Sequence, residues 1–295
     1  MKPLVLYCKS YSMDLRRVRR LAESVLRFNT ENLPFYVSVP GADYALFRDH
    51  LDEFGVELLA DEDIIRASSG IQPKRLAAMP GHLVQQVVKS EFWRLNLSEA
   101  CLCLDSDSIF IRPFGTADYM APDGTPYSVI TEAHDMMELS LRHGNQRVID
   151  NFQREARQVQ DIFDRTGKAY SFGPMPMVWH RSVWESLEKN HLLPHGMSFA
   201  DAIKQAPLES RWYGEALLKF KAVAVLPTEP FFKVYHHGWQ LDHDRRRGVD
   251  HEQLGRLYSG VIYQSSWERN MDWPREGGHW ASRLARRLRR AAGRF

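Results

Sequence analysis

Short apolar segments alternate with amphipathic ones near the start of the chain, and this alternation constrains the fold strongly. Strands are predicted at Leu4 to Cys8, Phe35 to Val39 and Val56 to Leu59, with helices over 14–28 and 42–54. Strands that alternate with helices in this way pair side by side into a largely parallel, doubly wound sheet. The expected fold class is therefore α/β, with a mixed, mainly parallel sheet flanked by helices.

A pair of carboxylates follows the next predicted strand. The apolar run from Cys101 to Leu104 is too short for a helix and predicts a buried strand, which Asp105, Ser106 and Asp107 follow directly. Buried carboxylates are costly unless a cation lies near them, and ligands bind at this end of the strands in open α/β sheets. A hard divalent cation, shared with substrate phosphates, meets both conditions. Asp and Ser also form turns and caps without any metal, and that alternative stays open.

Composition places the chain among globular proteins. It has 295 residues, of which 44% are hydrophobic and 26% charged. No apolar run approaches the roughly 18 residues of a membrane span. The N-terminal segment lacks the pattern of a secretory signal peptide, and the three cysteines lie in apolar segments, as buried reduced thiols would. We therefore expect a cytoplasmic protein.

A helix is predicted from His82 to about Leu97, immediately before the strand that carries the carboxylates. If this helix packs antiparallel to that strand, Lys89 points to the ligand edge of the sheet. A lysine there can neutralise a phosphate as a point charge. The alternative is a solvated helix surface.

Three later segments carry further candidate residues. The stretch 170–180 is too rich in glycine and proline for a central strand, and such segments line sites or fill cores. Glu215 is predicted near the first turn of a helix ending near Lys221, where the helix dipole favours it and where it can act as a general base. His236 and His237 precede a glycine, and in a strand only one of them can face a metal.

These residues resemble a known family, the GT-A nucleotide-sugar glycosyltransferases. The resemblance lies in two segments, Pro80-Gly-His-Leu-Val-Gln-Gln-Val-Val-Lys89 and Leu102-Cys-Leu-Asp-Ser-Asp-Ser-Ile-Phe-Ile-Arg-Pro-Phe114. Both segments are similar to those of a mostly uncharacterised bacterial branch of these enzymes. A Tyr-Ser-x-x-Pro-Met element and a Trp-x-x-Glu element follow in that branch, here at 170–175 and 212–215. The resemblance covers roughly residues 3–240.

The resemblance implies a site and its ligands. Asp107 would be the main ligand of Mn²⁺ or Mg²⁺, and Asp105 would contact the metal or the ribose. His236 or His237 would lie between metal and diphosphate, although this chain continues Gly-Trp-Gln where relatives have Lys-Pro-Trp. The early loop from Cys8 to Asp14 would lie near the nucleotide base, by its position in the chain. The other candidates for contact with the donor nucleotide are Tyr7, Ser10, Lys89 and Ser106.

The reaction implied is transfer of a sugar from a nucleotide-diphosphate donor, with a UDP-sugar preferred. The acceptor would be a glycan or a lipid-linked sugar in cell-surface polysaccharide synthesis. An inverting enzyme would need a base, for which Glu215 is the candidate, whereas a retaining enzyme would not. One catalytic domain is expected over 1–270, with a nucleotide-binding half at about 1–115 and an acceptor half at about 116–270.

The C-terminal segment, 271–295, is basic and amphipathic. Six arginines lie between Arg283 and Arg294, and Trp280, Leu284 and Leu288 share one face if the segment is helical. This pattern predicts an interfacial helix on an anionic membrane, at the inner face of the plasma membrane. The alternatives are nucleic-acid binding, which we do not expect, and a solvated tail.

Two other function classes use the same features. A haloacid-dehalogenase-type phosphatase would use Asp105 as its nucleophile, but its Asp-x-Asp motif normally ends the first strand, and no Gly-Asp-x-x-x-Asp motif follows here. A non-catalytic membrane-surface adaptor would depend on the basic tail alone. Both remain alternatives to the glycosyltransferase.

Overall fold

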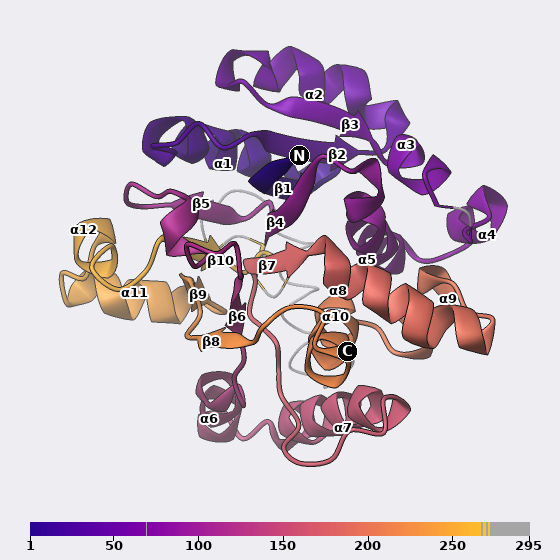
Figure 1. Cartoon of the computed structure of the whole chain (residues 1–295). Coiled ribbons are helices and arrows are strands. Elements are labelled where there is room, and N and C mark those ends of the chain that lie inside the picture. The colour runs from indigo at the N-terminus through magenta and orange to yellow at the C-terminus, as the bar shows by residue number, and fades with distance from the viewer. Residues whose placement is uncertain (69, 267, 270, 272–295) are drawn as a thin grey trace.

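The central sheet has four parallel strands and one antiparallel edge strand (Figure 1). The computed structural model describes residues 1–68, 70–266, 268–269 and 271. The strand order is β3-β2-β1-β4-β7. In chain order these strands are β1 (Lys2–Lys9), β2 (Phe35–Val39), β3 (Glu57–Ala60), β4 (Ser98–Leu104) and β7 (Met177–His180). The predicted mainly parallel α/β sheet is confirmed.

Strand β1 lies between β2 and β4 and is buried on both faces. Its residues from Leu4 to Cys8 have no exposed surface, as the continuous apolar run predicts. Cys8 pairs with Val37 of β2 on one side and with Leu104 of β4 on the other. The carboxyl ends of these three strands therefore meet at one edge.

Helices cover both faces of this sheet. Apolar residues of α1 and α2 pack with Leu4, Leu6 and Cys8 on one face, while those of α3 and α5 pack with Val5 and Tyr7 on the other. The helices of this half are α1 (Leu15–Phe28), α2 (Tyr44–Leu51), α3 (Asp61–Arg66), α4 (Pro73–Ala77) and α5 (Gly81–Glu91). This arrangement is the doubly wound one.

The helix predicted from 82 to 97 is shorter than expected. Helix α5 ends at Glu91, a 3₁₀ turn follows over Phe92–Leu95, and Asn96 closes it with a left-handed φ of 54°. A residue in that conformation ends a helix by turning the backbone away from it. The apolar periodicity of the sequence continues across this turn, so the sequence does not indicate that the helix ends at Glu91.

A second sheet begins directly after the two carboxylates. It has the order β5-β10-β9, formed by β5 (Ser108–Phe110), β10 (Gly260–Tyr263) and β9 (Phe232–Tyr235). Gly260 is required where these strands meet, because a Cβ there would lie 2.4 Å from the carbonyl oxygen of Ile109. A two-stranded sheet pairs β6 (Tyr127–Val129) with β8 (Leu226–Thr228).

The remaining helices belong to the second half of the chain, and Figure 1 shows α6 and α7 at the end away from α1 and α2. They are α6 (His134–Arg142), α7 (Gln146–Ile162), α8 (Arg181–Leu187), α9 (Phe199–Gln205), α10 (Glu209–Phe220), α11 (Gly238–Arg246) and α12 (His251–Leu254). The stretch 170–176 has no regular structure, and β7 starts directly after Pro176 as an edge strand. The prediction that the stretch 170–180 forms no central strand is confirmed, since its one strand, Met177–His180, lies at the edge of the sheet.

The predictions for the three cysteines and for the basic C-terminal tail have different outcomes. Cys8, Cys101 and Cys103 are free and buried, as predicted. The basic tail lies, apart from Met271, outside the described residues, so its predicted helix stays a prediction. Within the part of the chain that is described, no helix is both long and apolar enough to cross a membrane.

Candidate functional site at the carboxyl edge of the sheet

The strand order creates a switch point between β1 and β4. The chain proceeds outward from β1 through β2 to β3 and then returns to place β4 on the opposite side of β1. In open α/β sheets, ligands bind outside the carboxyl ends of the strands at such a point. Ser10 follows β1 and Asp105 follows β4, so both lie at this position.

Asp107 is buried in the turn that links the two sheets, and only 4% of it is exposed. Its Oδ2 accepts a hydrogen bond from the backbone nitrogen of Ser265 at 2.7 Å, and its carbonyl oxygen accepts one from Tyr263. Its Oδ1 is buried and has no hydrogen-bond partner among the described residues. Burial, followed by the nearby charge of Asp105, raises the pKa of Asp107 to about 6.

Asp105 is partly exposed and forms an ion pair with a buried lysine. Lys89 Nζ lies 2.9 Å from Asp105 Oδ1 and 3.3 Å from Glu209 Oε1. Burial disfavours the ammonium form, but the two carboxylates outweigh it and raise the pKa of Lys89 above its usual range. The predicted orientation of Lys89 towards the ligand edge is confirmed.

Glu209 is a site residue that sequence analysis missed. It begins α10, and its carboxylate faces Lys89 across the gap between α5 and α10. The sequence shows it only as one acidic residue after Pro207-Leu208, and a pairing between residues 120 positions apart has no local signal. The clue available was Lys89 itself, because a buried lysine requires carboxylate partners.

Ser106, between the two aspartates, approaches a separate cluster of charges. Its hydroxyl lies 3.5 Å from Asp14 Oδ2. Asp14 also accepts hydrogen bonds from the guanidinium groups of Arg17, at 3.2 Å, and Arg269, at 3.0 Å. Segments before α1 and after β10 therefore meet beside the two aspartates.

The carboxyl ends of β1, β2 and β3 carry a second polar cluster. Lys9 Nζ forms a 2.8 Å ion pair with Asp61, the first residue of α3. Ser10 Oγ and Asp61 Oδ1 are both buried and have no hydrogen-bond partner among the described residues. Buried polar atoms normally have a hydrogen-bond partner, so a ligand or water is the expected partner of these two.

Tyr7, in contrast, lies in the core. It is fully buried, its ring stacks on Phe92 at 3.8 Å between centroids, and its hydroxyl lies 2.9 Å from Ser38 Oγ. Of the two early residues predicted to contact the donor nucleotide, Tyr7 and Ser10, only Ser10 lies where strand β1 ends. Tyr7 supports the sheet beneath that position.

His236 and His237 follow β9, at the same edge of the second sheet as Asp107. Strand β10 lies between them and β5, and two strand spacings of about 4.8 Å each separate β9 from β5 by about 10 Å. The backbone nitrogens of both histidines donate to Gln240 Oε1. Burial lowers the pKa of His236, which favours the neutral imidazole that binds metals.

Glu215 lies in the middle of α10, and the prediction that places it near the first turn is wrong. The helix begins earlier because the Leu208 backbone nitrogen donates to Gln86 Oε1 at 2.6 Å, which starts α10 at Glu209. Glu215 is therefore about 9 Å further along the helix axis than Glu209 and on another face. Arg165 donates to both of its carboxylate oxygens.

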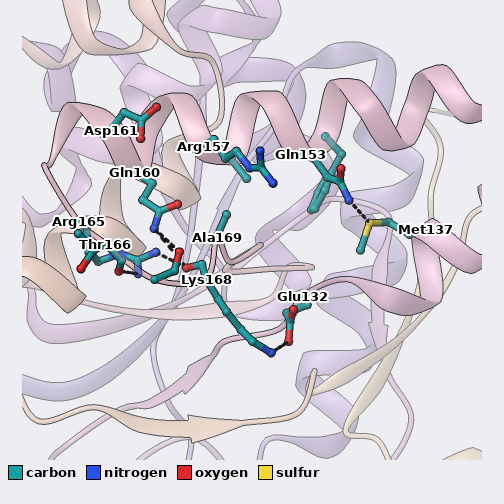
Figure 2. A pocket seen from close by; sticks show the side chains of 13 residues that line it. Glu132, Met137, Gln153, Arg157, Gln160, Asp161, Arg165, Thr166, Lys168 and Ala169 are labelled. Carbon is teal, nitrogen blue, oxygen red and sulfur yellow. Dashed lines mark hydrogen bonds and ion pairs between the residues drawn. The ribbon is translucent and has the colours of Figure 1, made fainter.

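Arg165 also lines a pocket of about 540 Å³ between α6, α7 and the loop 165–169. Figure 2 shows Lys168 bonded to Glu132 across this pocket, and Gln160 pointing to the backbone of the loop. Arg157 points into the same space from α7. The pocket is lined by amide, carboxylate and guanidinium groups, which suit a polar ligand.

The carboxylates fit a hard divalent cation in part. Among the described residues, no group of three His, Cys, Asp or Glu side chains is placed to hold a metal ion. Mg²⁺-type cations, however, need only one or two carboxylates when substrate phosphates supply further oxygens. Asp107 Oδ1, buried and without a partner among the described residues, is such an oxygen, and Asp105 is close enough to raise the pKa of Asp107.

Among the comparisons with known proteins, the one with solved structures shows the fold. A model of a family of unknown function, DUF6492, matches residues 3–203. No curated protein matches the sequence. Among solved structures, the galactosyltransferase LgtC, in complex with donor and acceptor sugar analogues, is similar with a TM-score of 0.50 and 11% identity, over 96% of this chain and 94% of that one. At that identity the likeness shows a GT-A-like fold.

Proposed function

The chain belongs to the family of unknown function DUF6492, and we propose that it is a metal-dependent glycosyltransferase with a nucleotide-diphosphate sugar as donor. One observation carries this proposal. At the switch point of a GT-A-like sheet, Asp105 and Asp107 lie together, and a buried oxygen of Asp107 has no partner among the described residues. A buried carboxylate oxygen of this kind is costly unless a ligand satisfies it.

Asp105 and Asp107 would hold Mn²⁺ or Mg²⁺, with His236 or His237 as the predicted additional ligand. Such an ion, when bound, neutralises the charge that builds on the leaving nucleoside diphosphate. Lys89 places a second positive charge beside Asp105, within the same edge of the sheet. The protein thus surrounds the diphosphate position with fixed charges before the donor arrives.

The nucleoside would lie over the ends of β1 to β3. Ser10 and Asp61 offer buried polar atoms there, and Ser106 offers a hydroxyl between the two aspartates. A UDP-sugar is the preferred donor. These contacts all come from residues 1–115, the half that the sequence assigns to the nucleotide.

The acceptor would bind to the second half, over residues 116–270. The polar pocket in Figure 2 belongs to this half, and Arg157 offers a guanidinium group that can donate hydrogen bonds to sugar hydroxyls. A glycan or a lipid-linked sugar is the proposed acceptor, in cell-surface polysaccharide synthesis. The basic tail would hold the enzyme at the inner face of the plasma membrane from the cytoplasmic side.

If transfer inverts the sugar, a base must take the proton of the acceptor hydroxyl. Glu215, the base that the sequence predicts, is buried and bound through both oxygens to Arg165. This ion pair favours a structural role for Glu215. The phosphatase alternative has less support, because Asp105 follows the fourth strand of the chain and not the first.

Thermal unfolding in the presence of UDP, GDP, CMP or dTDP, with and without Mn²⁺, tests the proposal. A ligand that binds only the folded protein raises the melting temperature. We expect at least one nucleoside diphosphate to stabilise the protein in the presence of Mn²⁺, and Asp107→Asn to lose that shift. Stabilisation that is the same without metal and in Asp107→Asn would contradict the proposal.

A further inference from the structure

Lys89 lies between two carboxylates that come from different parts of the chain. Its ammonium is 2.9 Å from Asp105 and 3.3 Å from Glu209. The side chains of Lys89 and Glu209 are 8% and 6% exposed, whereas that of Asp105 is 33% exposed. Asp105 is thus the partner that a ligand from solvent can reach, and Glu209 is the partner that it cannot.

The position of Glu209 is fixed by the start of α10. Gln86, on the same helix as Lys89, accepts a hydrogen bond from the backbone nitrogen of Leu208 at 2.6 Å. Leu208 has a φ of 92°, a conformation that costs energy in any residue other than glycine. A strained backbone of this kind persists only where the surrounding contacts hold it. The contacts that hold Leu208 therefore also fix the backbone position from which the Glu209 side chain reaches Lys89.

The charges of this cluster match a divalent cation. Three carboxylates, those of Asp105, Asp107 and Glu209, and one ammonium, that of Lys89, sum to −2 when all are ionised. A cation of charge +2 brings the sum to zero. A cation at Asp105 also repels the ammonium at the same carboxylate, since like charges a few ångströms apart in a buried site interact strongly. Lys89 then has Glu209 as its remaining partner.

We propose that Lys89 is a latch on the cation site, which holds Asp105 while the site is empty and shifts to Glu209 when Asp105 takes the cation. This inference rests on the proposed function, because it needs a divalent cation at Asp105 and Asp107. Glu209 is a positioning residue, since it acts only through Lys89. The latch keeps the buried carboxylates neutralised before the cation binds, and it makes Lys89 a competitor of that cation.

Mn²⁺ binding to the full chain, measured by titration calorimetry without nucleotide, tests the latch. Lys89→Met removes the competitor and should tighten Mn²⁺ binding about tenfold. Glu209→Gln leaves Lys89 with Asp105 as its one carboxylate partner and should weaken Mn²⁺ binding about tenfold, a typical size for changes next to metal ligands. In the double variant the effect of Glu209→Gln should disappear. Lys74→Met, which removes an exposed lysine of α4, is the control and should change nothing.

The following results of the Mn²⁺ titrations would contradict the latch. If Lys89→Met weakens Mn²⁺ binding or leaves it unchanged, or if Glu209→Gln weakens it equally with and without Lys89, the latch is wrong. If Lys89→Met does not fold, Glu209→Gln is decisive alone, and an unchanged affinity overturns the latch. Wild-type protein that binds no Mn²⁺ without nucleotide overturns this inference, and if it also binds none in the presence of UDP, it overturns the proposed metal dependence as well. Binding that is lost in Asp107→Asn but insensitive to Lys89 and Glu209 overturns the latch only.

Discussion

Arg165 donates hydrogen bonds to both carboxylate oxygens of Glu215, and its Nη2 lies 2.8 Å from Oε1. The same guanidinium donates to the carbonyl oxygen of Lys168 at 2.9 Å. One buried ion pair therefore ties the loop after α7 to the middle of α10. The segment 170–176 leads from this loop to β7, whose first residue, Met177, pairs with Cys103 near the end of β4.

Glu215→Gln should lower stability more than it lowers turnover. The change removes the charge from a buried pair of hydrogen bonds, and charge-assisted hydrogen bonds contribute about 2 kcal/mol each. Chemical denaturation should show a loss of about that size. Donor turnover, measured well below the melting temperature, should fall by less than tenfold.

Glu132→Gln is the matched control, because it removes an exposed carboxylate from a 2.7 Å ion pair with Lys168. Exposed pairs contribute at most about 1 kcal/mol, so its effect on stability should be small. A Glu215→Gln protein that keeps its stability and loses all turnover would instead identify Glu215 as the base.

Gly214→Ala should destabilise the protein although alanine is the better helix former. A Cβ at this position in α10 would lie 2.0 Å from the ring of Phe172, so the ring and the segment 170–176 must move. Gly81→Ala in α5, where nothing lies within 4 Å of the new Cβ, is the control and should be neutral or stabilising. Equal melting temperatures for the two variants would show that the contact between Gly214 and Phe172 is unimportant.

Acidification from pH 7 to pH 5 should destabilise the protein, in part through His191. This imidazole is buried and stacks on Phe163, and burial lowers its pKa below the ordinary value. The unfolded chain then binds a proton that the folded protein does not, so stability falls as the pH falls below about 6.5. Urea denaturation at several pH values measures this loss.

His191→Gln should reduce that pH dependence, by no more than about 1.4 kcal/mol per pH unit, the limit for one proton. The exposed His50→Gln serves as the control. If both variants keep the full wild-type pH dependence, His191 does not contribute to it.

Removal of residues 280–295 should abolish binding to anionic membranes. The six arginines of this segment are expected to bind anionic lipid at about 1 kcal/mol each near the surface. Co-sedimentation with phosphatidylserine vesicles at low salt should therefore be lost on deletion, and neutral vesicles provide the control. Unchanged co-sedimentation after deletion would refute the membrane role.

Local sequence patterns predicted the first half of the fold well. The strand at 35–39 was predicted with the bounds that the structure has, because continuous apolar runs mark buried parallel strands. Asp105 and Asp107 could be placed at the ligand edge for the same reason. Lys89 could be directed to that edge because its helix is the last one before β4 in the chain.

Contacts between distant segments could not be predicted in this way. Glu209 reaches Lys89 only because Gln86 fixes the start of α10, and Ser265 reaches Asp107 only because β10 returns to pair with β5. Neither contact leaves a periodic signal near the residues involved. The sequence predicts Glu215 near the first turn of this helix because the true start of α10, at Glu209, depends on that distant contact.

Release of nucleoside diphosphate from a panel of nucleotide sugars, with and without Mn²⁺, tests the central claim most directly. The wild-type protein should release the diphosphate from at least one donor, and only in the presence of the metal. The rate of Asp107→Asn should be at least a hundredfold lower. This loss corresponds to about 3 kcal/mol, as expected when one group that stabilises the transition state is removed. Asp49→Asn, on the exposed surface of α2, should keep the wild-type rate. Release that needs no metal and survives in Asp107→Asn, or no release from any donor, would contradict the account.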